Sequence, residues 1–191
     1  MVGMVAEVET GKWPERVSGE WTLDLLDSLP EDNLRYELLD GTLLVSPAPV
    51  PRHQAAIGEL YLLLRAACPK DHFVFLAPLD WRPDGRTSLE PDLLVVRRDR
   101  IGEKNIVETP ALVVEVLSPS SARIDRMLKF ARYAEGGIEQ YWIVDPRVPS
   151  VEICDLRDGS YELTASGERD QTISVATPFA IAVTPAALVT I

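Results

Sequence analysis

The chain is predicted to adopt an α/β (α+β) fold, with a mixed central sheet flanked by helices and additional β-hairpins. Two short apolar runs near the middle, residues 90–96 and 111–119, are typical of buried strands. Helical patterns lie before and after these runs. The pairs Asp40-Gly41 and Asp158-Gly159 separate β-prone segments and indicate hairpin turns. The order hairpin, helix, strands, helix, strand therefore predicts a sheet with helices on its faces.

The N-terminal third begins with a polar leader, residues 1–17, and residues 18–191 are expected to form one domain. Thr22 can cap a short helix that runs to Leu29, because Pro30 ends it. Residues 35–39 and 42–46 flank Asp40-Gly41, which predicts the first hairpin and gives Asp40 a turn role.

The first long helix is predicted over residues 53–67, with Pro51 at its first turn. Its apolar stripe is expected to consist of Ile57, Leu60, Leu64 and Ala67. A strand over residues 73–77 and a turn at residues 83–85 follow, before the two central strands.

A polar connection, residues 97–110, joins the two central strands, and a second helix is predicted over residues 123–135, closed by Gly136-Gly137. Strands are expected over residues 141–145, 151–156 and 161–165, with an irregular C-terminal stretch. The apolar stripe of the second helix is expected to be the following residues: Ile124, Met127, Leu128, Ala131 and Ala134.

Composition indicates an ordinary globular protein, with 46% hydrophobic and 26% charged residues. The apolar runs are shorter than the roughly 20 residues that cross a bilayer, and no secretory signal is recognisable, so no membrane association and a cytoplasmic location are expected. Two cysteines in different contexts fit a reducing compartment. The net charge of −11 argues against non-specific coating of nucleic acid, although residues 97–132 are locally basic.

Two carboxylates in the central strands are the strongest indication of function. Glu115 interrupts an otherwise apolar strand, where a charge is costly unless a cation or hydrogen bonds compensate it. The alternative is a buried ion pair with an arginine such as Arg123. Asp92 follows Pro91 at the start of the other strand, and alone it could be a turn acid. Together the two acids predict a site for a hard divalent cation.

For three further residues, the sequence pattern alone does not decide between a structural and a functional role. Glu37 on the first hairpin is most simply an exposed strand acid. His53 opens the first long helix, either as a core or capping histidine or as a phosphate contact at a helix N-terminus. Lys129 lies off the apolar stripe of its helix and is either a solvated lysine or, with Asp125 four residues earlier, part of an orienting pair.

The chain resembles the Uma-two family, largely uncharacterised bacterial proteins with a restriction-endonuclease-like fold of the PD-(D/E)XK superfamily. Five linked features carry the resemblance, from residue 21 to the C-terminus: the segment 35–41, His53-Gln54, residues 90–92 with 115–119, Lys129 with Tyr133, and residues 141–146. The resemblance implies that Asp92, Glu115 and Glu37 are metal ligands for Mg²⁺ or Mn²⁺, and that His53 and Lys129 belong to the catalytic set.

What the resemblance implies for function is a metal-dependent endonuclease that hydrolyses phosphodiester bonds in DNA. A homodimer is expected by analogy with nucleases that cut both strands. The superfamily usually places a lysine two residues after the second acid, and this chain has Leu117 there. Lys129 would have to supply that amine from its helix. The alternative is a catalytically inactive nuclease-fold module that binds nucleic acid or a protein partner.

Overall fold

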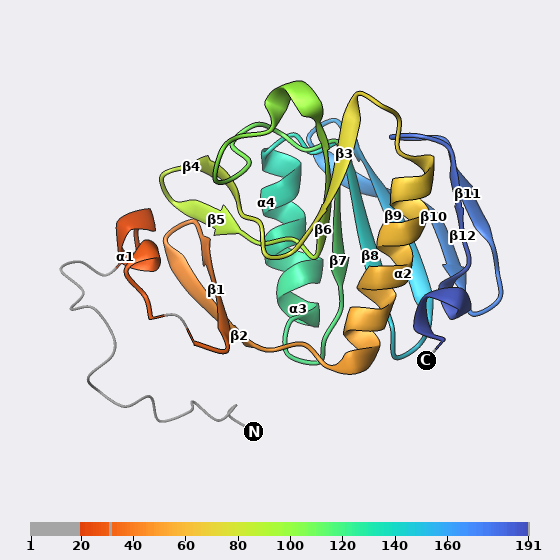
Figure 1. Cartoon of the computed structure of the whole chain (residues 1–191), viewed down its shortest axis with the longest axis horizontal. Coiled ribbons are helices and arrows are strands. Elements are labelled where there is room, and N and C mark those ends of the chain that lie inside the picture. Colours follow the sequence, from red (N-terminus) through yellow and green to blue (C-terminus); the bar gives the residue numbers. More distant parts are fainter. Residues whose placement is uncertain (1–19, 31, 191) are drawn as a thin grey trace.

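A six-stranded mixed sheet forms the centre of the computed structural model, which describes residues 20–30 and 32–190 (Figure 1). The predicted leader lies outside the described residues. The strand order is β10-β9-β8-β7-β6-β3, and only β7 and β8 run parallel. The strands are β3 (His72–Leu76), β6 (Leu93–Arg97), β7 (Leu112–Val116), β8 (Gln140–Asp145), β9 (Ser150–Arg157) and β10 (Ser160–Glu168).

A smaller four-stranded sheet, ordered β2-β1-β5-β4, lies beside the central sheet, on the left in Figure 1. It contains β1 (Leu34–Leu39), β2 (Thr42–Pro47), β4 (Trp81–Asp84) and β5 (Thr87–Leu89). The first hairpin is confirmed, and its turn has positive φ at Asp40 and Gly41, 49° and 82°, as a two-residue hairpin turn requires. The hairpin of β4 and β5 was not predicted, and its turn lies at residues 85–86, so the turn predicted at residues 83–85 begins too early.

The helix α2 (Pro51–Ala67) covers one face of the central sheet. Pro51 occupies its first turn, and the predicted stripe of Ile57, Leu60 and Leu64 is buried against strands β3, β6 and β7. A short helix α1 (Leu23–Asp27) packs on β1, and the Thr22 hydroxyl accepts a hydrogen bond from Leu25 N at 3.3 Å. Both helices therefore confirm the sequence prediction, within two residues at each end.

The opposite face is covered by one continuous helical segment in three parts: α3 (Ala122–Ile124), the π-helical turn η2 (Asp125–Lys129) and α4 (Phe130–Glu135). The predicted apolar stripe is wrong, because Met127 and Leu128 are 57% and 49% exposed. The buried face carries Asp125, Lys129 and Tyr133 instead, spaced four residues apart. This face is buried because Lys129 forms hydrogen bonds with Glu37 of β1 and Glu115 of β7.

The C-terminal stretch is more regular than predicted. It forms a two-stranded ribbon, β11 (Ile173–Val175) with β12 (Ile181–Val183), and a 3-10 helix, η3 (Pro185–Val189). These elements pack with α2 on the same face of the central sheet. Within the described residues, no helix is long and apolar enough to cross a membrane.

Candidate active site

The two predicted acids lie next to each other at the ends of adjacent antiparallel strands. Leu93 of β6 pairs with Val114 of β7, so Asp92 and Glu115 are the next pair in this register. Residues opposite each other in an antiparallel pair project from the same face. Both carboxylates are only 2% exposed. A buried strand pair therefore presents two acids side by side, which is the arrangement that the sequence predicted.

Asp92 is held by three groups. Its Oδ2 accepts a hydrogen bond from Val116 N at 2.8 Å and lies 3.4 Å from His53 Nε2, while Oδ1 accepts from Arg35 Nη1 at 3.0 Å. Burial alone would raise the pKa of Asp92. The hydrogen bonds and charges of these groups outweigh burial and lower its pKa. Asp92 is therefore ionised at neutral pH.

Glu115 has different partners. Its Oε1 accepts hydrogen bonds from Lys129 Nζ at 2.9 Å and from the Tyr133 hydroxyl at 2.7 Å. Burial raises the pKa of Glu115 to about 8, because the charge of Lys129 offsets only part of the desolvation and the nearby acids Asp125 and Asp92 oppose ionisation. The expected alternative partner, Arg123, is not the cation that meets Glu115.

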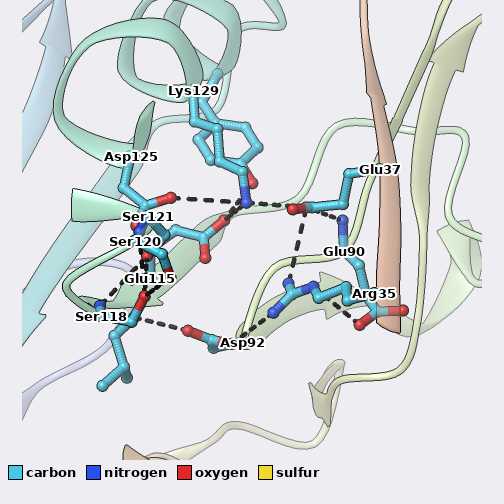
Figure 2. A network of polar contacts seen from close by, with 12 residues as sticks. Arg35, Glu37, Glu90, Asp92, Glu115, Ser118, Ser120, Ser121, Asp125 and Lys129 are labelled. Atoms are coloured by element: carbon cyan, nitrogen blue, oxygen red, sulfur yellow. Dashed lines mark hydrogen bonds and ion pairs between the residues drawn. The ribbon is translucent and has the colours of Figure 1, made fainter. Parts of the chain in front are cut away.

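Glu37 joins the same network from β1, and its interpretation as an exposed strand acid is wrong. The residue is 3% exposed, and its Oε1 accepts hydrogen bonds from Lys129 Nζ and from Glu90 N, both at 2.8 Å. Although burial would raise its pKa, the charges of Lys129 and Arg35 lower it. Figure 2 shows Glu37 and Glu115 approaching Lys129 from different elements.

Lys129 lies at the centre of the network. Its side chain is buried between Glu37 and Glu115, with the Asp125 carboxylate 3.7 Å away. The interpretation as a solvated surface lysine is therefore wrong. The π-helical turn from Asp125 to Lys129 carries both residues on the inner side of the helix, and such turns are frequent at functional sites. Leu117, at the usual lysine position of the superfamily, is buried in the core instead.

His53 lies in the first turn of α2, beneath the two strands. It is buried, and its Nε2 lies 2.7 Å from the Val116 carbonyl oxygen. Because a carbonyl only accepts, Nε2 carries a proton and donates it to this bond. Nδ1 is buried and has no hydrogen-bond partner within the described residues. His53 is thus a positioned group beside Asp92 with one nitrogen available.

Sequence reasoning missed Arg35, which bridges Asp92 and Glu90, and gave no role to the Tyr133 hydroxyl, which donates to Glu115. Asp125 was one of the two alternatives for Lys129, and it lies beside that lysine. The spacing contained a signal for some of them. Arg35 lies two residues before Glu37, on the same face of a strand, and Asp125, Lys129 and Tyr133 recur every four residues on one helix face.

Acids exceed permanent cations in this network. Within the described residues, Arg35 and Lys129 are the permanent cations that pair with the following carboxyl groups: Glu37, Glu90, Asp92, Glu115 and Asp125. Burial raises the pKa of Glu90, Glu115 and Asp125, so it opposes the build-up of negative charge in the network. A divalent cation would compensate that charge, and carboxylate oxygens are the ligands that Mg²⁺ and Mn²⁺ prefer.

The network therefore fits a divalent cation in charge and in donor type. Within the described residues, however, no group of three His, Cys, Asp or Glu side chains is arranged around one metal position. Arg35 and Lys129 lie between the carboxylates. The network borders a pocket of about 770 Å³, which Arg35, Glu37, Asp92, Glu115 and Lys129 all line.

Comparisons with known proteins agree with this architecture. A family model, Uma2, described as "Putative restriction endonuclease", matches residues 23–187. Among solved structures, the chain is similar to "a putative nuclease belonging to DUF820" from Anabaena variabilis, with 22% identity, a TM-score of 0.69, and coverage of 87% of this chain and 96% of that one. No curated protein matched the chain. The predicted nuclease-like fold is thereby confirmed.

Proposed function

The chain belongs to the Uma2 family, and from this premise we propose that it is a metal-dependent endonuclease that hydrolyses phosphodiester bonds in DNA. One observation carries the proposal. Glu37, Asp92, Glu115 and Lys129 come from four different elements, yet they meet in one polar network on the wall of an accessible pocket. Stability alone does not favour such an arrangement, because buried ion pairs often contribute little to stability. Buried acids with shifted pKa values are typical of functional sites.

Asp92 and Glu115, together with Glu37, would hold the cation, with Mg²⁺ or Mn²⁺ as the candidates. The chemistry that a bound divalent ion supplies is activation of a water molecule and stabilisation of charge on the phosphate. Ionisation of Glu115 is also part of the binding step. With its pKa raised to about 8, this side chain must release a proton when a cation binds.

Lys129 would stabilise the negative charge that develops on the phosphoryl oxygens, or orient the attacking water. Its Nζ, already placed between Glu37 and Glu115, replaces the lysine that the superfamily usually has at the position of Leu117. Lys129 comes from the helical segment that contains η2, so the packing of that segment, and not strand β7, determines where its Nζ lies.

His53 would contact the substrate phosphate or assist proton transfer. Its Nε2 is committed to the Val116 carbonyl, so only Nδ1 can take part in either role.

Nicking of supercoiled plasmid DNA tests the proposal directly. The parent should convert plasmid to the open-circular form with Mg²⁺ or Mn²⁺ and not with a chelator. Glu115→Gln should reduce the rate at least a hundredfold, whereas Glu108→Gln, a change at an exposed glutamate, should not alter it. Equal rates for the parent and Glu115→Gln would refute the assignment.

A second candidate is a catalytically inactive nuclease-fold module that binds nucleic acid or a protein partner. The specific observation in its favour is that Lys129 and Arg35 pair with Glu37, Asp92 and Glu115, so two side-chain cations already compensate these acids. Metal-dependent thermal stability separates the two candidates. If the parent is the nuclease, millimolar Mg²⁺ or Mn²⁺ should raise its melting temperature and leave Asp92→Ala unaffected. An unchanged parent would favour the inactive module.

A further inference from the structure

Arg35 occupies a position in the network that the proposed mechanism does not use. From β1 its guanidinium spans two carboxylates: Nη1 lies 3.0 Å from Asp92 Oδ1, and Nε lies 3.0 Å from Glu90 Oε1. A third acid, Glu37, is 3.7 Å from Nη2. Figure 2 shows Arg35 between Asp92 and Glu90, on the side of the network away from Lys129. Arg35 therefore shares Asp92 and Glu37 with any cation that binds there.

The two cations of the network differ in their freedom to move. Lys129 is 2% exposed and enclosed, with two short hydrogen bonds to Glu37 and Glu115. The side chain of Arg35 is 23% exposed and lines the pocket. Although its Nε and Nη2 lie near acids, neither makes a hydrogen bond of good geometry. Arg35 is thus the less tightly bound cation, and much of its donor capacity is unused.

We propose that Arg35 is a phosphate-binding residue that competes with the divalent ion for Asp92, and that moves to a substrate phosphate when the ion is bound. This inference rests on the proposed nuclease function. A divalent ion on Asp92 would neutralise the carboxylate that now holds Nη1, and would repel the guanidinium. The planar fork of arginine matches two phosphate oxygens, which a lysine ammonium does not. The pocket beside Arg35 is where the substrate backbone would enter.

Metal affinity is the first test, measured by titration calorimetry with Mn²⁺ alone and no DNA. Arg35→Gln removes the competing charge, so it should bind Mn²⁺ about tenfold more tightly than the parent. The matched control is Arg147→Gln, which removes the same charge from the rim of the same pocket, where Arg147 pairs with Asp145. It should change the affinity by less than about twofold, because exposed charges are screened.

DNA affinity is the second test, measured by fluorescence anisotropy of a short DNA duplex with Ca²⁺ in place of Mg²⁺. Arg35→Lys keeps the positive charge and loses the fork, so it should bind the duplex roughly five- to tenfold more weakly than the parent. Its melting temperature should stay close to that of the parent. Should Arg35→Gln fail to fold, the result for Arg35→Lys decides.

Unchanged Mn²⁺ affinity in folded Arg35→Gln, or unchanged duplex affinity in Arg35→Lys, would overturn the inference. Either result, combined with metal-dependent nicking by the parent, leaves the nuclease proposal intact. A parent that binds neither Mn²⁺ nor the duplex overturns both. A parent that binds both without nicking DNA overturns only the catalytic assignment, and the two affinity comparisons still decide the role of Arg35.

Discussion

Replacing Lys129 by methionine probes the buried network most directly. Lys129→Met keeps the length of the side chain but removes the only cation that contacts both Glu37 and Glu115, at 2.8 and 2.9 Å. Breaking a buried pair on one side typically costs about 3–5 kcal/mol, since a buried charge is left uncompensated. Glu37 retains its bond from Glu90 N, and Arg35 lies 3.7 Å away, so we place the cost near the lower end of this range, about 3 kcal/mol.

The cost of Lys129→Met should depend on pH. The pKa of Glu115 is raised to about 8 with Lys129 present, and loss of this cation raises it further. At pH 6 the Glu115 carboxyl group is protonated, so removing Lys129 takes little stabilising energy from it. At pH 9 the group tends to ionise, and without Lys129 burial opposes that ionisation. The destabilisation should therefore grow from pH 6 to pH 9.

Urea unfolding with a chelator present measures the free energy of unfolding of the parent and of Lys129→Met at both pH values. For a chain of this size, 3 kcal/mol corresponds to a fall in melting temperature of roughly 10 °C. Lys70→Met, a change at an exposed lysine, should stay within about 0.5 kcal/mol of the parent. A cost below about 1 kcal/mol at both pH values would show that Lys129 does not stabilise the buried acids.

Three further predictions test other features of the structure. Glu115→Gln should flatten the pH dependence of stability. The folded-state pKa of Glu115, about 8, exceeds its ordinary value of 4.5, so this group contributes stability below pH 4.5 that is lost as the pH rises through 8. An equal dependence on pH of the free energy of unfolding, measured by urea titration of both proteins, would contradict this. Leu128→Gln should cost less than about 0.5 kcal/mol, because Leu128 is exposed. Tyr133→Phe should cost about 1–2 kcal/mol, because it loses a buried hydrogen bond to Glu115. A larger fall in melting temperature for Leu128→Gln than for Tyr133→Phe would mean that the helix is rotated. Gly136→Ala should destabilise by about 1–3 kcal/mol, since its Cβ would lie 2.3 Å from Trp81. Gly58→Ala, with open space around the new Cβ in α2, should stabilise by about 0.5–1 kcal/mol. Stability changes of the same sign in the two variants would refute the packing at Gly136.

Local patterns were sufficient for most elements of the fold. The Asp40-Gly41 turn, the Pro51 start of α2 and the buried runs around Asp92 and Glu115 were all predicted from neighbouring residues. These features depend on backbone conformation and periodicity, which operate over a few residues. The hairpin of β4 and β5 and the ribbon of β11 and β12 were missed, because their strands are short and are stabilised by packing on distant segments.

The burial of Glu115 was predicted correctly because a charge in an apolar strand is anomalous in its own neighbourhood, whereas Asp92 was interpreted through its pairing with Glu115. The sequence by itself therefore determined that Glu115 needs a partner. Only the tertiary structure decided which partners the two acids have. Glu37 looked like an exposed strand acid, and the sequence left Lys129 open between a solvated lysine and a partner of Asp125. Both are buried because their carboxylate and ammonium groups meet across 92 residues of sequence. The spacing of Asp125, Lys129 and Tyr133 places them on one helix face, but only the complementary charge of remote segments decided that this polar face turns inward.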